Sequence, residues 1–193
     1  MRRRILVIAP TLHNHNPLPS VADEIAEIRR YHDALVLDGD VDLIDITRAV
    51  NDGNFDVLWF ATGAAGNQVH LSRETIGAGE LMRLLAASKA RLLVLATCDT
   101  QTLPNRLRAA NVHILAGIDV VRDDFAASVS MQFARALYEL RSIRKAYYSL
   151  SAGEEWLYLS PNGALEDARW YWLAGGIGIA VAFFVGMMAL GAL

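Results

Sequence analysis

Cys98 is the only cysteine of the 193-residue chain, and it lies two residues after the apolar run of residues 92–96. A cysteine in such a place can act as a nucleophile. Only the thiolate attacks, however, and an unperturbed thiol pKa of about 8.5 leaves a few per cent ionised at neutral pH. Nucleophilic chemistry therefore needs a base or a positive charge beside Cys98. The alternative is a structural role, because free cysteine often packs as a small buried hydrophobe.

Three histidines are candidates for that base. His70 lies in a predicted hairpin strand, residues 68–71, and reaches Cys98 only if the loop folds unusually; otherwise it is a strand histidine that faces solvent. His13 and His15 follow the first predicted strand and offer a more remote base or a His-X-His metal fragment. No further cysteine or acidic cluster accompanies them, so we expect no metal site.

A glycine-rich turn follows a second apolar run, residues 57–61. Thr62, Gly63 and Gly66 belong to this turn, and such turns after parallel strands present backbone N–H groups to anions. The Gly-Lys-Ser/Thr ending and the Gly-X-Gly-X-X-Gly spacing are both absent, so we expect no nucleotide cofactor. Asp99 is either a helix-capping carboxylate or part of the same crevice. We predict that these four residues line a ligand crevice. The two glycines are expected to allow backbone conformations or close approaches that a side chain would obstruct.

The two apolar runs are predicted to be neighbouring buried parallel strands, whose carboxyl ends form the crevice of an open α/β sheet. Further strands are predicted at residues 5–9, 34–37 and 113–116, and helices at residues 21–32, 42–50, 79–88, 105–110, 123–140 and 142–150. This alternation predicts an α/β fold with a mostly parallel sheet and helices on both faces.

Residues 172–193 contain no charged side chain. A helix of this length spans roughly 33 Å, which matches a bilayer core. Trp170 and its aromatic neighbours form an interfacial belt at the entrance. The sequence therefore predicts a globular domain at residues 1–152, a linker at 153–169 and one C-terminal transmembrane helix at 170–193.

Basic residues precede the predicted span, at Arg135, Arg141, Arg144, Lys145 and Arg169. By the positive-inside rule they place the globular domain in the cytoplasm, and the chain in the inner membrane with a single pass. The formal net charge is −3 and no basic cluster with interleaved aromatics is present, so nucleic acid is not an expected partner.

Small residues recur every four positions in the predicted span, at Ala174, Gly178, Ala182 and Gly186. Such a stripe lets two helix backbones approach closely. We predict that the membrane helix self-associates and that the protein is a homo-oligomer.

The pattern over residues 5–152 resembles the CHAT family of bacterial caspase-like proteases, within the caspase and separase type of α/β fold. The likeness is strongest in the strand ends at residues 55–62 (FDVLWFAT) and 93–100 (LVLATCDT), and in the helix at 122–138. The resemblance implies that Cys98 occupies the nucleophile position. It also implies a His-Gly pair after the first strand end, where this chain has Gly63 and Ala64.

Loss of a general base typically costs on the order of 10²–10⁴ in rate, so we favour a catalytically degenerate domain that acts as a signalling or assembly module. The resemblance implies a setting in bacterial anti-phage defence, with activation by a protein partner or a small-molecule signal. Two alternatives stay open. One is an active membrane-tethered cysteine protease that uses Cys98 and a non-standard base such as His70. The other is a sensor of a nucleotide second messenger.

Overall fold

The large sheet of this protein has the strand order β10-β9-β8-β7-β3-β1-β2. The computed structural model describes residues 2–13, 18–65, 67–97, 102–117, 123–150, 156–161 and 165–166. Five parallel strands form most of the sheet: β1 (Arg4–Pro10), β2 (Asp33–Gly39), β3 (Val57–Ala61), β7 (Leu92–Ala96) and β8 (His113–Gly117). β3 and β7 lie inside the sheet and every residue of both is buried, as the apolar runs predicted.

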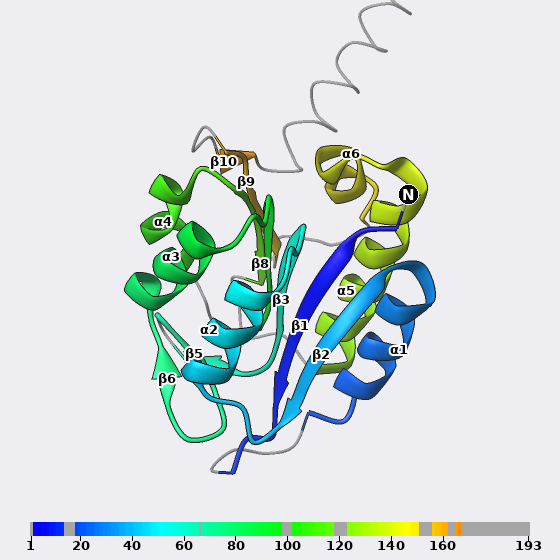
Figure 1. Cartoon of the computed structure of the whole chain (residues 1–193). Helices are drawn as coiled ribbons and strands as arrows, with labels where there is room; N and C mark the ends of the chain where they lie inside the picture. The colour runs from blue at the N-terminus through cyan, green and yellow to red at the C-terminus, as the bar shows by residue number, and fades with distance from the viewer. Residues whose placement is uncertain are drawn as a thin grey trace, which may run out of the picture.

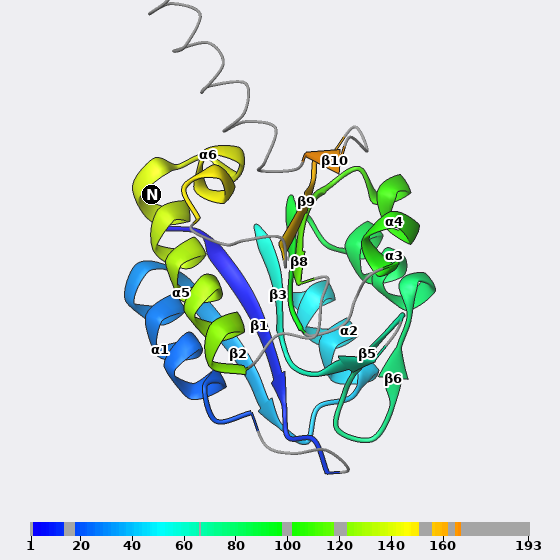
Figure 2. The ribbon, with the colours of Figure 1, turned by 180° about the vertical axis from the view of Figure 1, so that it is seen from behind.

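Helices cover both faces of the sheet (Figure 1 and Figure 2). One face carries α1 (Val21–Tyr31), α5 (Asp123–Leu140) and α6 (Ile143–Tyr148). The other carries α2 (Leu43–Asp52), α3 (Ala78–Ala87), α4 (Leu103–Arg106) and the 3₁₀ turn η1 (Arg108–Ala110). Alternate strand residues enter alternate cores: Trp59 packs under α5 beside Phe133, whereas Leu58 and Phe60 pack under α2 and α3. The predicted α/β architecture is confirmed.

A small antiparallel sheet follows β3. Its strands are β4 (Ala64–Ala65), β5 (Gln68–His70) and β6 (Thr75–Ile76), in that order. The sequence predicted only the middle strand. The outer two are two residues long, too short to show a periodic pattern.

The stretch expected to be a linker differs from the prediction. Residues 156–159 form β9 (Trp156–Leu159), antiparallel to β8, and β10 (Leu165–Glu166) pairs with β9 in turn. Trp156 and Tyr158 enter the core under α5, while Leu159 enters the opposite core. Both faces of β9 are covered, and its apolar run of four residues is too short to distinguish a strand from other buried segments.

Two helix starts also differ from expectation. Ser20 precedes α1 but its side chain makes no capping hydrogen bond, whereas Asp42 caps α2 by accepting from the backbone N–H groups of Ile44 and Asp45. The helix expected at residues 105–110 is split into α4 and η1, and α4 starts earlier with Pro104 in its first turn.

The predicted span at residues 170–193, with Ala174, Gly178, Ala182 and Gly186, lies outside the described residues. Among the helices that are described, none is long and apolar enough to cross a membrane.

Candidate functional site

The carboxyl ends of β3 and β7 lie side by side. Ala61 pairs with Ala96, and the next residues of the two strands are Thr62 and Thr97, which are 2% and 1% exposed. The Thr62 hydroxyl donates a hydrogen bond to the carbonyl oxygen of His70 at 2.9 Å. The Thr97 hydroxyl has no hydrogen-bond partner in the part of the chain that the structure describes. The two predicted strand ends therefore meet at one edge of the sheet.

Gly63 and His70 face each other across the small hairpin. The His70 backbone N–H donates to the Gly63 carbonyl oxygen at 2.9 Å, next to the paired residues Ala64 and Val69. A Cβ atom on residue 63 would lie 3.5 Å from the His70 Cδ2 and 3.3 Å from the Leu12 Cδ1. The imidazole thus lies beside the place where a side chain of residue 63 would begin.

A glycine at position 63 was expected either for a close approach or for an unusual backbone conformation, and the structure shows the close approach. Leu12 approaches closely enough that a side chain at position 63 would have to displace it by a few tenths of an ångström. The backbone of Gly63 is not in the left-handed region, so conformational freedom is not what this position requires.

The loop between β5 and β6 is fastened to the loop between β2 and α2. The Ser72 hydroxyl accepts from the Val41 N–H at 2.9 Å and donates to the Gly39 carbonyl at 3.0 Å. The Glu74 carboxylate accepts from the Leu43 N–H at 2.8 Å. We call residues 71–74 the hairpin clasp. Because it joins β5 directly, the clasp fixes the position of His70 relative to the large sheet.

Asp40 joins three loops at the same edge. Its carboxylate contacts the His13 Nε2 at 2.5 Å and the Arg73 guanidinium at 2.5 Å. The hydrogen bond with His13 lowers the pKa of Asp40 below its ordinary value, and the positive charge of Arg73 acts in the same direction. All three side chains are about half exposed or more, so solvent screens the pairs. His13 therefore lies in a surface ion-pair cluster.

The structure brings together some of the predicted site residues. Thr62 and Gly63 each form a hydrogen bond with the backbone of His70. Cys98, Asp99, Gly66 and His15 lie outside the described residues.

Sequence reasoning missed two sets of polar residues. Asp40 lies in the loop after β2 and Ser72 and Arg73 lie in the loop after β5, and no local spacing connects the two loops. Glu24 was predicted only as an acid in the first turn of a helix, yet it is 3% exposed and accepts a 2.6 Å hydrogen bond from the Trp59 indole N–H. The polar Trp59 N–H within an apolar run was the only available signal, since a buried indole usually finds an acceptor.

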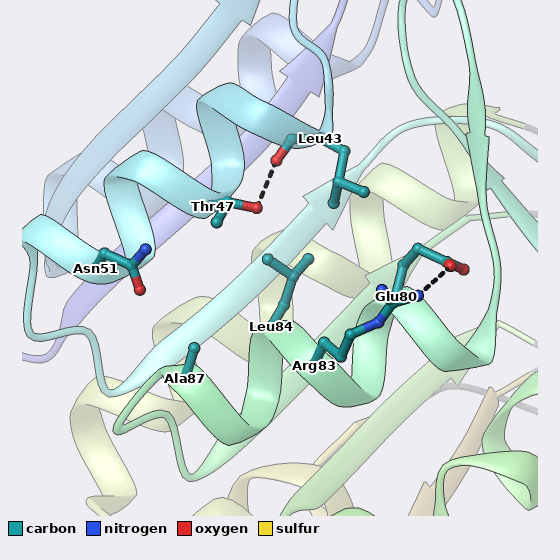
Figure 3. A pocket seen from close by; sticks show the side chains of 7 residues that line it. All are labelled: Leu43, Thr47, Asn51, Glu80, Arg83, Leu84 and Ala87. Atoms are coloured by element: carbon teal, nitrogen blue, oxygen red, sulfur yellow. Dashed lines mark hydrogen bonds and ion pairs between the residues drawn. The ribbon is translucent and has the colours of Figure 1, made fainter.

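A separate groove of about 340 Å³ runs between α2 and α3 (Figure 3). Leu43, Thr47 and Asn51 form the α2 wall, and Glu80, Arg83, Leu84 and Ala87 form the α3 wall. Glu80 bridges the Arg83 guanidinium at 2.7 Å and the Gly77 N–H at 3.0 Å, and backbone hydrogen bonds lower its pKa. None of the predicted site residues lines this groove.

The sequence matches no protein-family model and no curated protein. The structure is similar to that of a secreted C11 cysteine protease from Bacteroides thetaiotaomicron, solved with an irreversible peptide inhibitor. The TM-score is 0.57 at 10% sequence identity, covering 83% of this chain and 67% of the protease chain. An NADH:FMN oxidoreductase, EmoB, aligns with a TM-score of only 0.38 at 15% identity over 79% of this chain and 92% of its own, and we draw nothing from it. At such low identity the likeness to the protease concerns the fold alone, and this chain has a caspase-like fold.

Proposed function

We propose that this protein is a membrane-anchored caspase-like pseudoprotease that acts by signalling and assembly. One observation carries the proposal. Residue 63, where the CHAT resemblance expects the catalytic histidine, is a glycine at the carboxyl end of β3, beside the strand that leads to Cys98. A thiol without its base loses on the order of 10²–10⁴ in rate from that contribution alone.

The C-terminal segment supplies the effector in this proposal. Residues 170–193 anchor the chain in the inner membrane, with the globular domain in the cytoplasm, and the small-residue stripe gathers the helices. A partner protein or a small molecule triggers assembly, and the clustered helices perturb the membrane. Anti-phage defence is the setting that the CHAT resemblance supports.

The test of the pseudoprotease is the loss of the thiol. We expect Cys98→Ala, expressed at the wild-type level, to keep the membrane depolarisation and growth arrest caused by the wild-type protein in cells. Gly63→His is not expected to create a protease, because Leu12 and His70 occupy the space around position 63. Complete loss of cellular activity in Cys98→Ala would contradict the proposal.

A second candidate function is a membrane-tethered cysteine protease in which His70 replaces the missing base. The observation in its favour is the 3.5 Å between the His70 Cδ2 and the Cβ position of residue 63. This function predicts that His70→Ala and Cys98→Ala each abolish cellular activity. His13→Ala is the control, because His13 is bonded to Asp40. Retained activity in His70→Ala and Cys98→Ala would reject the protease.

A further inference from the structure

Exposed basic side chains gather where the parallel strands begin. We call the following six residues the basic end: Arg2, Arg4, Arg91, Arg141, Arg144 and Lys145. Backbone hydrogen bonds bring their elements together. The Asp56 N–H donates to the Arg4 carbonyl at 2.8 Å, and the Arg91 N–H donates to the Asp56 carbonyl at 2.9 Å. The Arg3 guanidinium reaches the Arg141 carbonyl at 3.3 Å. These contacts place a positive surface at one end of a chain whose net charge is −3.

Helix dipoles do not account for this surface. Basic residues are favoured in the last turn of a helix, which explains Arg29 and Arg30 of α1. Lys145 belongs to the last turn of the six-residue helix α6 and is favoured in the same way, whereas Arg144 is the second residue of α6, where the macrodipole disfavours positive charge. The presence of Arg144 there calls for another reason.

Acidic side chains at this end are fewer than the basic ones, and some of them bind basic residues. Asp33 lies 3.8 Å from the Arg4 guanidinium, and the Asp56 carboxylate accepts from the Arg4 backbone N–H at 2.9 Å. Glu139 binds Arg135 at 2.8 Å. Asp52, at the end of α2, adds a third nearby carboxylate to Asp33 and Asp56, and the six basic residues still outnumber these three acids.

The described chain finishes at the same end of the molecule. Leu165 of β10 pairs with Leu159 of β9, which pairs with Ile114 near the start of β8. Figure 1 and Figure 2 both show β10, α6 and the start of β1 at one end of the molecule. Trp170 comes four positions after Glu166, and an extended chain covers at most about 3.5 Å per residue. The proposed membrane entry therefore lies within about 14 Å of β10.

We propose that the basic end lies on the membrane and binds anionic phospholipid headgroups. The inference rests on the membrane anchor of the proposed function. Positive charge and the start of the anchor occur together at one end, and juxtamembrane basic residues are attracted to anionic lipid surfaces. The carboxyl edge of the sheet, with Thr62, Gly63 and His70, lies at the opposite end of the strands and faces away from the bilayer.

The experiment measures which end of the sheet contacts headgroups. Full-length protein in a Cys98→Ser background receives one fluorophore, either at Asn54→Cys, between α2 and β3 at the basic end, or at Thr11→Cys, just beyond β1 at the other end. Both positions are exposed. The protein is reconstituted in phosphatidylcholine vesicles with or without phosphatidylglycerol, and quenching by headgroup-attached nitroxide is recorded.

In vesicles that contain phosphatidylglycerol, we expect strong quenching at position 54 and weak quenching at position 11. The difference between the two positions should be absent in pure phosphatidylcholine. It should also disappear near 1 M salt, where the screening length is about 3 Å. Arg144→Glu with Lys145→Glu should lower the ratio of docked to undocked domains roughly fivefold or more for each residue. Arg73→Glu with Arg83→Glu makes the same charge change away from the basic end and should leave the ratio unchanged.

Each other outcome overturns the inference in a distinguishable way. Protein that stays with the vesicles in alkaline carbonate, but shows equal quenching at both positions or no lipid dependence, has an anchor and no docking surface. Protein that carbonate extracts has no anchor, and then both proposals fail. A short RNA with the same total negative charge as the phosphatidylglycerol is added as a competitor. If this RNA releases the globular domain from the vesicle surface, the basic end binds nucleic acid and the lipid assignment is overturned.

Discussion

At the scale of single residues, Thr62 and Thr97 form a natural pair for comparison. Both are buried at the ends of adjacent strands, but within the described residues only the Thr62 hydroxyl has a hydrogen-bond partner. We expect Thr62→Val to lower the free energy of unfolding by about 1–2 kcal/mol, since it leaves the buried His70 carbonyl without this donor. Thr97→Val should be neutral or stabilising, because it removes a buried hydroxyl that is unsatisfied. Urea unfolding of the detergent-solubilised chain measures both, and equal losses would contradict the assignment.

His32 gives a residue-scale prediction for pH. Its Nε2 donates to the Ala134 carbonyl at 2.9 Å, its Nδ1 accepts from the Arg3 N–H, and burial lowers its pKa below the ordinary 6.5. Below about pH 6.5 the unfolded chain binds the proton more readily, so this stabilisation is complete above that pH and is lost as the pH falls through the folded pKa.

The corresponding variant is His32→Gln. We expect the wild-type unfolding midpoint in urea to fall between about pH 7.5 and 5.5, and His32→Gln to show a smaller fall over the same range. A dependence unaltered by His32→Gln would show that another group titrates.

At the scale of elements, the hairpin clasp decides where His70 lies. Ser72→Ala leaves the buried Val41 N–H without an acceptor and removes the donor to the partly buried Gly39 carbonyl, a loss of about 1–3 kcal/mol. We expect hydrogen exchange to accelerate at the amides of β5 and β6. Ser88→Ala, which removes a similar hydrogen bond at the end of α3, should leave those amides unchanged. Faster exchange throughout the chain in Ser72→Ala would mean global destabilisation and no specific clasp.

The elements that sequence predicted well are those with a strong local pattern. β3 and β7 are uninterrupted apolar runs, and α5 carries a long helical stripe, so burial dictates their type. β9 was missed because its apolar run is only four residues long, too short to be assigned by periodicity. The site was only partly predictable for a related reason. The contact of His70 with Gly63 depends on the hairpin and on Ser72, which bonds a loop 31 residues away, and no short-range pattern encodes that pairing.

At the scale of the whole molecule, self-association of the membrane helix is the main prediction. Replacing Gly178 and Gly186 together with Leu should disrupt close backbone packing in the proposed span and lower both oligomer size in detergent and depolarisation in cells. Replacing Gly176 and Gly191, which lie off the stripe, with Leu is the matched control. Unchanged oligomers and unchanged depolarisation in the glycine variant, with insertion confirmed, would leave the segment as a plain anchor. Because linked contacts raise each other's effective concentration, a trigger that gathers the caspase-like domains would also gather the helices.

β9 gives the molecule a mechanical connection between its two ends. Trp156 pairs with Gly117 at the carboxyl edge, and Leu159 pairs with Ile114 close to the opposite edge, a run of roughly 10 Å at 3.3 Å per residue. Its antiparallel bonds join it to β8 along its whole length, but to β10 through only two residue pairs. The antiparallel strand therefore couples the crevice edge of the sheet to the end that carries β10, so that the two ends belong to one hydrogen-bonded unit.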